Sequence, residues 1–171
     1  MTEVAGYRQA IANFATGVVI VTAMHEGRRY AMTANALTSV SLDPILLLVC
    51  FTRESDTGRA VRESGWLALN VLDVAHGEEI VRRGARKQVA EADKLDGVSV
   101  TVGQHGLPLI DDALAHVVCR VERILDGGDH EIVVGEVVHF DERQDDDAEP
   151  MLFYRGGLYG LVHGTAEAHA S

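Results

Sequence analysis

The sequence is poor in cysteine, and the two cysteines that it has do not suggest a disulfide framework. Cys50 ends the apolar run 46–50, and Cys119 ends the run 117–119. Apolar surroundings suit buried, reduced thiols, whereas small secreted proteins carry several paired cysteines. We therefore expect two free thiols and a cytoplasmic protein.

Long apolar stretches and linker-like segments are also missing. The run 44–51 is far too short to span a membrane, and the first residues lack the basic start and apolar stretch of a signal peptide. No internal repeat and no segment rich in proline, glycine and serine divides the 171 residues. Since one domain usually has roughly 100 to 200 residues, we expect a single domain over 1–171, with a frayed tail from about residue 164.

Positive charge is scarce. The chain has 15 Lys and Arg against 26 Asp and Glu, which gives a formal net charge of -11. Such a field repels phosphate backbones and anionic lipid surfaces, so we expect neither nucleic acid nor a membrane as partner. The same field opposes small anions, and a nucleotide therefore needs a local site made of backbone N–H groups and a few basic side chains.

The motifs of several common enzyme classes are absent. The sequence has no Gly-x-Ser-x-Gly elbow, no P-loop and no Gly-x-Gly-x-x-Gly after a strand, so the usual serine hydrolases, NTPases and Rossmann dehydrogenases lose support. The eight histidines are scattered, and Cys-x-x-Cys does not occur. His116 and Cys119 lie three positions apart on an expected strand, where their side chains point to opposite faces, so we expect no metal site.

The hydrophobic patterns predict a mainly β fold. Strands are expected over 18–23, 30–36, 45–52, 66–72, 114–125, 132–140, 151–154 and 158–162. A helix is expected over 4–14, a second between Ser55 and Gly65, and a third within 75–92. Because strands and helices do not alternate regularly, an antiparallel barrel with a few helices is favoured over a doubly wound sheet.

The richest polar cluster lies between Tyr30 and Pro44. Its neutral polar side chains are Thr33, Asn35, Thr38, Ser39 and Ser41. The small residues Ala34 and Ala36 allow a flat ligand to approach the backbone, and such a strand edge suits the polar rim of isoalloxazine. From spacing alone, an ordinary strand and turn rich in Thr and Ser explains the cluster better.

Three further segments could contact a ligand, and each also has a simpler explanation. Arg53, Ser55 and Thr57 could receive a phosphate at the start of a helix, or Ser55 could only cap that helix. His130 follows a Gly-Gly-Asp loop and could orient a nicotinamide, whereas a lone loop histidine is more often simply solvated. The segment 153–157 could stack on a ring and pair with a phosphate, or form a strand end and tight turn.

Taken in order, these segments resemble the flavin reductase family of FMN-binding split barrels, the small reductase components of two-component flavin monooxygenases. The resemblance spans about residue 4 to residue 162. It is carried by FATGVVIVT at 14–22, MTANALTSVS at 32–41 with Pro44, CF at 50–51, S-x-T at 55–57, LNVL at 69–72, DKLDG at 93–97, GDH at 128–130, GEV at 135–137 and YRGG at 154–157. It implies an antiparallel split barrel of the Greek-key type and a homodimer with flavin near the subunit interface.

The resemblance also implies roles for particular residues. Contacts to the flavin ring and ribityl chain are implied for Thr33, Ala34, Asn35, Ala36, Thr38 and Ser39. Contacts to the ring edge and phosphate are implied for Cys50, Phe51, Ser55 and Thr57, and positions near the nicotinamide for His130, Tyr154, Arg155 and Gly156. Arg86 and Lys87 match further flavin contacts, in a segment where Gly84 stands in place of the family's common Phe.

The leading hypothesis is an NAD(P)H:flavin oxidoreductase that reduces FMN, or FAD, by hydride transfer and supplies reduced flavin to a separate monooxygenase. NADH or NADPH is the expected electron donor, and His130 is the expected catalytic residue because it would orient the nicotinamide. The alternative is a flavin- or haem-binding split barrel without turnover, since a fold does not determine a function. A third possibility, an oxidase related to the pyridoxamine phosphate oxidases, is disfavoured by the Gly-Asp-His and Tyr-Arg-Gly-Gly segments.

Overall fold

The computed structural model describes residues 2–86, 94–145 and 147–161, and its largest element is a seven-stranded antiparallel sheet. The strand order is β3-β2-β6-β9-β10-β5-β4. The bounds of these strands are Val19–His25 (β2), Arg28–Ala34 (β3), Leu37–Leu42 (β4), Ile45–Thr52 (β5), Trp66–Val71 (β6), Ala115–Gly127 (β9) and His130–Glu142 (β10).

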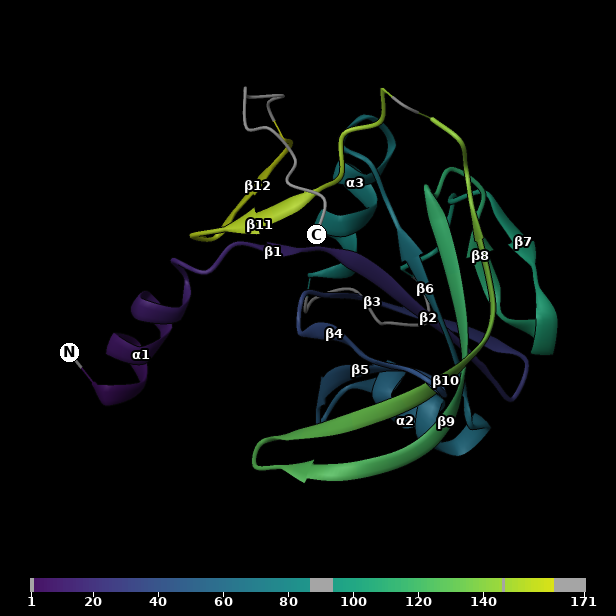
Figure 1. Cartoon of the computed structure of the whole chain (residues 1–171), viewed down its shortest axis with the longest axis horizontal. Coiled ribbons are helices and arrows are strands. Elements are labelled where there is room, and N and C mark those ends of the chain that lie inside the picture. Colours follow the sequence, from purple (N-terminus) through teal and green to yellow (C-terminus); the bar gives the residue numbers. More distant parts are fainter. Residues whose placement is uncertain (1, 87–93, 146, 162–171) are drawn as a thin grey trace.

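β3 and β4 are the two edge strands of this sheet, although they follow each other in the sequence. Only Asn35 and Ala36 separate the end of β3 from the start of β4. So short a link reaches about 10 Å at most, and the sheet therefore curls until its two edges approach each other (Figure 1). The result is an antiparallel barrel that is split between β3 and β4, which confirms the expected fold class.

Two smaller sheets and three α-helices complete the described part of the chain. The first small sheet is formed by β1 (Thr16–Gly17), β11 (Leu152–Tyr154) and β12 (Gly157–Tyr159), and the second by β7 (Val100–Val102) and β8 (Pro108–Ile110). The helices are α1 (Glu3–Ile11), α2 (Asp56–Ser64) and α3 (Val74–Gly84), and a 3₁₀ turn covers Gln104–Gly106. In Figure 1, α1 stands apart from the barrel, whereas α3 lies next to the β11–β12 hairpin. No helix of the described segments is long and apolar enough to cross a membrane.

Several local predictions are confirmed, and others need correction. β5 has the predicted bounds, and α2 begins after Ser55, whose side chain accepts from the Gly58 N–H, and ends before Gly65 at a φ of 78°. The predicted helix 4–14 instead ends at Ile11, because the Asn13 side-chain amide donates to the carbonyls of Gln9 and Ala10. The predicted helical segment 75–92 forms a helix over Val74–Gly84, and residues 87–93 lie outside the described residues.

Two buried clusters hold the barrel together. One fills the barrel under α2 and includes Phe51, Val61, Leu67 and Cys119. The other lies under α3 and includes Leu72, Val81, Leu95, Ile110 and Met151. Both cysteines are free, as predicted, and burial raises the pKa of Cys119 to about 12.

A buried amide ties the β7–β8 hairpin to the main sheet. Asn70 on β6 accepts a hydrogen bond from the Ile110 N–H at 2.8 Å and donates to the Ile20 carbonyl at 3.1 Å. Thr22 on β2 donates to the Pro108 carbonyl at 2.6 Å. Because these polar groups are buried, the hydrogen bonds also satisfy groups that water cannot reach.

Candidate flavin site

A cavity of about 670 Å³ opens where β3, the end of α3 and the β11–β12 hairpin meet. It is lined by Val18, Thr33, Asn35, Val81, Arg82, Ala85, Arg86, Phe153, Gly156 and Leu158. Four of these ten residues, Thr33, Asn35, Arg86 and Gly156, were predicted from the sequence to contact flavin or nicotinamide. The fold therefore brings together residues that are more than 100 positions apart in the chain.

One wall of the cavity is formed where α3 presses directly on β3. Gly84 is buried at this contact, and a Cβ added there would overlap the Thr33 Oγ1 and lie 3.1 Å from the Thr33 backbone nitrogen. The Thr33 hydroxyl donates to the Val81 carbonyl at 2.7 Å. The residue that departs from the family pattern, Gly84, thus permits the close approach of α3, and the Thr33 hydroxyl serves this packing.

The opposite wall is a two-residue hairpin. Tyr154 pairs with Gly157, and the intervening Arg155 and Gly156 have φ values of 47° and 82°. Positive φ at both central positions is typical of a type I′ turn, which glycine adopts without strain. The turn places Gly156 in the cavity, with Phe153 before it.

Arg155 does not line the cavity in this structure. Its Nε donates to the Asn13 side-chain oxygen at 2.9 Å, its backbone N–H donates to the Ala12 carbonyl at 3.1 Å, and its guanidinium lies 5.2 Å from the centre of the Tyr154 ring. Arg155 therefore ties the hairpin to the end of α1. Tyr154 also contacts Tyr159 edge to face.

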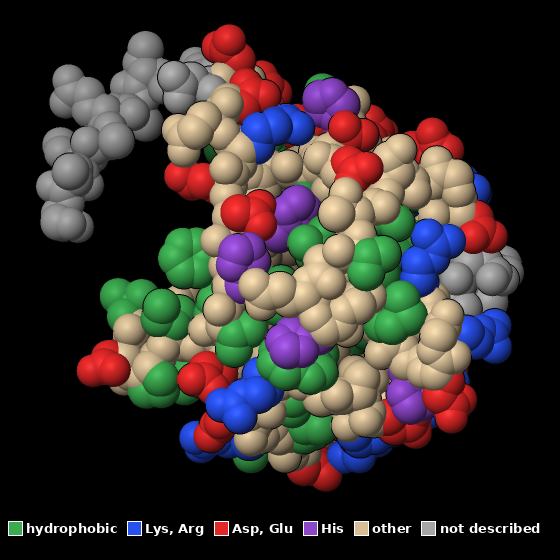
Figure 2. All heavy atoms as spheres, turned by 90° about the vertical axis from the view of Figure 1, so that its right-hand side faces the viewer, with side chains coloured by type: hydrophobic (Ala, Val, Ile, Leu, Met, Phe, Trp, Pro, Cys, Tyr) green, Lys and Arg blue, Asp and Glu red, His purple; other side chains and the backbone are tan. Residues whose placement is uncertain are grey.

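Two arginines give the cavity a local positive charge. Arg82 lies in the last turn of α3 and Arg86 follows two residues after the end of the helix, and both line the cavity. Arg82 forms an ion pair with Glu78 at 2.7 Å. On the face seen in Figure 2, basic side chains lie in small separate groups among acidic ones. In a chain of net charge -11, these two arginines are the basic side chains of the cavity, although Glu78 compensates part of the charge of Arg82.

The other predicted flavin residues are not among those that line this cavity. Ala34 is buried in β3, and Ala36, Thr38 and Ser39 are exposed on the link and on β4. Cys50 is partly buried in β5, and burial raises the pKa of its thiol. The roles of these residues remain predictions.

Phe51, Ser55 and Thr57, predicted to contact the ring edge and phosphate, are buried, whereas Arg53 is exposed. Phe51 and Thr57 have no exposed surface, and a Cβ added to Gly58 would lie 2.9 Å from the Phe51 Cβ. The Ser55 hydroxyl accepts from the Gly58 N–H at 3.0 Å and donates to the Met32 sulfur at 3.3 Å. Ser55 therefore caps α2, the simpler of the two roles considered for it. Lys87 lies outside the described residues.

His130 lies at the tip of the β9–β10 hairpin. It begins β10, and its Nδ1 lies 2.7 Å from the Asp129 carboxylate, which lowers the pKa of Asp129. Arg53 donates to the Gly128 carbonyl at 2.8 Å and pairs with Asp126 at 2.6 Å, which fixes this tip against the end of β5. His130 is not among the residues that line the cavity.

The sequence also contained a signal for one cavity residue that was missed. Arg82 lies four positions before Arg86 in the predicted helical segment, a spacing that puts two residues on one face of a continuous helix, although α3 ends at Gly84. Phe153 belongs to the segment 153–157, which was considered for stacking on a ring, and it lies on the opposite face of its strand from Tyr154. Val18 and Leu158 carried no polar signal, and only the packing of β11 and β12 places them at the cavity.

Comparisons with known proteins identify the family of the chain. The family model described as flavin reductase like domain matches residues 11–161. The chain belongs to this family. A reductase component of a 4-nitrophenol 4-monooxygenase/4-nitrocatechol 2-monooxygenase from Rhodococcus opacus is 38% identical over 152 residues, covering 89% of this chain and 78% of the relative. An NADH-dependent flavin reductase from Rhodococcus sp is 35% identical and is covered over 94% of both chains.

Solved structures show the same fold. The NADH:FAD oxidoreductase of Streptomyces globisporus C-1027, in complex with NAD and FAD fragments, superposes with a TM-score of 0.86 at 32% identity and covers 96% of each chain. The family resemblance inferred from the sequence is thus confirmed, and with it the use of a flavin and a nicotinamide cofactor.

Proposed function

We propose that this flavin reductase reduces FMN with NADH or NADPH and passes the reduced flavin to a separate monooxygenase. The observation that carries the proposal is the cavity itself, in which a neutral strand edge, apolar walls and two arginines converge in an acidic chain. A volume of about 670 Å³ suits a ligand of this size, since small-molecule sites usually measure about 300 to 1,000 Å³.

The residues present fit a flavin mononucleotide. Asn35 and the adjacent backbone offer neutral hydrogen bonds to the polar edge of a ring, and Phe153 and Leu158 exclude water from it. Arg82 and Arg86 can bind the phosphate. When both cofactors are bound, the nicotinamide supplies a hydride and the flavin ring accepts it. The protein's task is to hold the two rings close together in the right orientation.

A homodimer forms part of the proposal, because His130 and the cavity lie apart in one chain. A second groove of about 700 Å³ runs between β4–β5 and β9–β10 and is lined mainly by leucine and valine. Exposed apolar side chains lie on the same strands, including Leu42, which is 84% exposed, and Phe140, which is 65% exposed. Surfaces of this kind usually mark protein interfaces. A second copy of the chain bound in this groove would bring the tip of its β9–β10 hairpin toward the first chain.

Replacing Phe140 with Asp is expected to convert the dimer to a monomer and to reduce flavin reduction at least about tenfold, because a charge would be buried in an apolar interface. The mass measured by light scattering and the rate of NADH oxidation test this. Val102→Asp is a matched control, since Val102 is equally exposed, at 68%, but lies on β7 outside the groove. A Phe140→Asp protein that remains dimeric would contradict this interface.

The function is tested by mixing the purified protein with NADH and excess FMN in air. We expect NADH consumption well above that of a flavin-only control, and none from a flavin- or haem-binding protein without turnover. His130→Ala is expected to lower kcat/KM for NADH at least about tenfold if His130 orients the nicotinamide. Unchanged kinetics in this variant would remove that role but leave the function intact.

A cytoplasmic location is also part of the proposal, and the thiols support it. Two free cysteines, one of them fully buried, suit a reducing compartment. The proposal therefore places the reaction in the cytoplasm, where NADH and NADPH are formed.

A further inference from the structure

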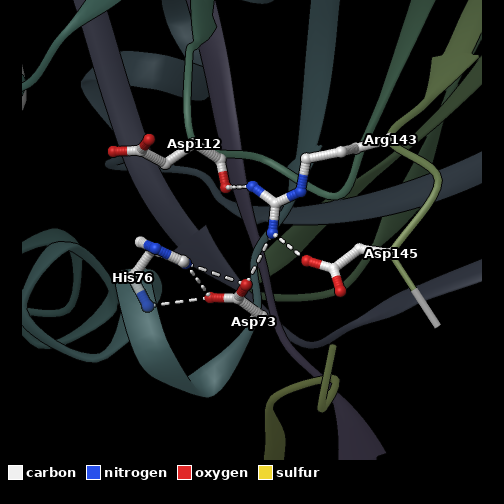
Figure 3. Close-up of polar contacts among 5 residues, drawn as sticks. All are labelled: Asp73, His76, Asp112, Arg143 and Asp145. Carbon is white, nitrogen blue, oxygen red and sulfur yellow. Dashed lines mark hydrogen bonds and ion pairs between the residues drawn. The ribbon is translucent and has the colours of Figure 1, made fainter. Parts of the chain in front are cut away.

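A buried carboxylate with two basic partners lies at the start of α3, the helix whose other end borders the cavity (Figure 3). The Asp73 side chain is only 4% exposed and accepts from the Arg143 guanidinium at 2.8 Å. His76 contacts the same carboxylate twice, through its backbone N–H at 2.8 Å and its ring Nδ1 at 2.9 Å. Arg143 also donates to the Asp112 carbonyl at 3.2 Å and to the Asp145 carboxylate at 3.2 Å. Three separate segments therefore meet at Asp73.

The balance of forces on Asp73 favours its charged form. Burial alone would raise the pKa of this carboxyl group, but the hydrogen bonds from His76 and Arg143 outweigh burial, and the pKa lies below its ordinary value. The interaction with Arg143 is therefore that of two opposite charges at neutral pH. It persists until the carboxyl group is protonated in acid.

Asp73 lies where the two elements that form the cavity walls, α3 and the segment leading into β11, come together. Asp73 caps the start of α3, which carries Val81 into the cavity at its far end and is followed directly by Ala85 and Arg86. Asp73 also forms a β-bridge with Pro150. The adjoining backbone bonds run from the Val74 N–H to the Glu149 carbonyl at 3.0 Å and from the Met151 N–H to the Leu72 carbonyl at 3.4 Å. The segment 149–151 leads directly into β11, which carries Phe153.

Simple stabilisation does not account well for this cluster. Within the part of the chain that the structure describes, the buried Arg143 Nε has no hydrogen-bond partner. An unpaired buried donor costs free energy, and a buried ion pair often contributes less to stability than apolar residues of similar size. Because burying these charged groups costs free energy, a role in fixing the geometry of the elements that they join explains the cluster better than a contribution to stability.

We propose that Asp73, together with Arg143 and His76, is a positioning cluster for flavin binding. The cluster holds the start of α3 beside the segment that leads into β11, and it thereby sets the distance between the two cavity walls. This inference rests on the proposed function, because it assigns flavin to the cavity between those walls. The cluster touches neither cofactor. It acts through Val81, Arg86 and Phe153.

The test compares FMN affinity and folding stability in the same variants. Asp73→Asn/Arg143→Met removes both charges of the buried pair and keeps an Asn that can cap α3. The Asp145 carboxylate loses its Arg143 partner, but its side chain is 39% exposed and can be solvated. We expect this double variant to melt near the wild-type Tm but to bind FMN about tenfold more weakly, with KM raised more than kcat is lowered. In Arg143→Lys, the ammonium group can still pair with Asp73, but it lacks the planar fork with which Arg143 also bonds Asp112 and Asp145. The FMN Kd of this variant is therefore expected to lie between the values of the wild type and the double variant.

Arg62→Met is the matched control. It removes the ion pair between Arg62 on α2 and Glu131, which measures 2.6 Å, and Arg62 does not line the cavity. The proposal is overturned if folded Arg143→Lys and the folded double variant both bind FMN with the wild-type Kd. If the double variant does not fold, a wild-type Kd in Arg143→Lys alone overturns it. A wild-type protein that neither binds FMN nor oxidises NADH contradicts the proposed function instead.

Discussion

Replacing Gly84 with alanine is expected to weaken both the fold and the flavin site. The added methyl group would overlap the Thr33 hydroxyl and approach the Thr33 backbone nitrogen to 3.1 Å, so α3 has to move away from β3. Overpacking of this kind costs about 1–3 kcal/mol. In a chain of this size each kcal/mol lowers Tm by about 2–4 °C.

The loss of catalysis should exceed the loss of stability. Moving α3 breaks the hydrogen bond from Thr33 to the Val81 carbonyl and displaces Val81, Arg82 and Arg86 together. A displacement of about 1 Å can cost about 10²-fold in rate when it affects the groups that position a substrate. We therefore expect kcat/KM for FMN to fall about 10- to 100-fold.

Gly17→Ala provides the matched control, since a Cβ at position 17 meets no atom within 4 Å. Melting curves and steady-state kinetics of the two variants, measured side by side, separate the specific contact from the general effect of replacing a glycine. If Gly84→Ala keeps both the wild-type Tm and the wild-type kinetics, α3 does not need its close contact with β3.

The sequence was sufficient where the signal is local. The run 45–51 is apolar, is followed by the β-branched Thr52 and starts after Asp43-Pro44, so its strand could be predicted to the residue. Ser55 and Gly65 likewise marked the ends of α2, because a cap and a left-handed glycine act on their own helix alone. The strand β4 was not assigned, since its side chains are mostly exposed and only its pairing with β5 makes it a strand. The three-residue strands β7 and β8 depend on each other in the same way.

The candidate site could be predicted only in part for a similar reason. Thr33, Asn35 and Gly156 belong to short motifs with recognisable residue types, and all three line the cavity. The contact that shapes the cavity is between Gly84 and Thr33, which lie 51 positions apart in the numbering. From the sequence, Gly84 was a departure from the family pattern. Only the packing of α3 on β3 gives it a physical reason.

Replacing Arg82 and Arg86 together with methionine is expected to weaken FMN binding about 100-fold or more. A hydrogen bond to a charged group contributes about 1.5–3 kcal/mol, and about 1.4 kcal/mol corresponds to a tenfold change in affinity. Both side chains line the cavity at the C-terminal end of α3. The helix dipole is negative at that end and repels a phosphate, so the two guanidinium groups have to supply the attraction.

Riboflavin separates this effect from a general disturbance of the site. It has the same ring and ribityl chain but no phosphate, so its KM is expected to change much less than that of FMN in the Arg82→Met/Arg86→Met protein. The wild-type preference for FMN should also decline as salt is added, because the attraction is electrostatic and the arginines are exposed. Equal losses for FMN and riboflavin would show that the arginines shape the cavity rather than bind the phosphate.

The same measurement decides between the two places where the phosphate could bind. The sequence favoured the start of α2, where Arg53 and Ser55 lie. Arg53 is paired with Asp126 just as Arg82 is paired with Glu78, but neither Arg53 nor Ser55 lines the cavity, and the Ser55 hydroxyl caps the helix. Arg53→Met is therefore expected to leave the ratio of the FMN and riboflavin KM values near that of the wild type. A ratio that changes in Arg53→Met, and not in the Arg82→Met/Arg86→Met protein, would move the phosphate to α2 and leave the ring in the present cavity.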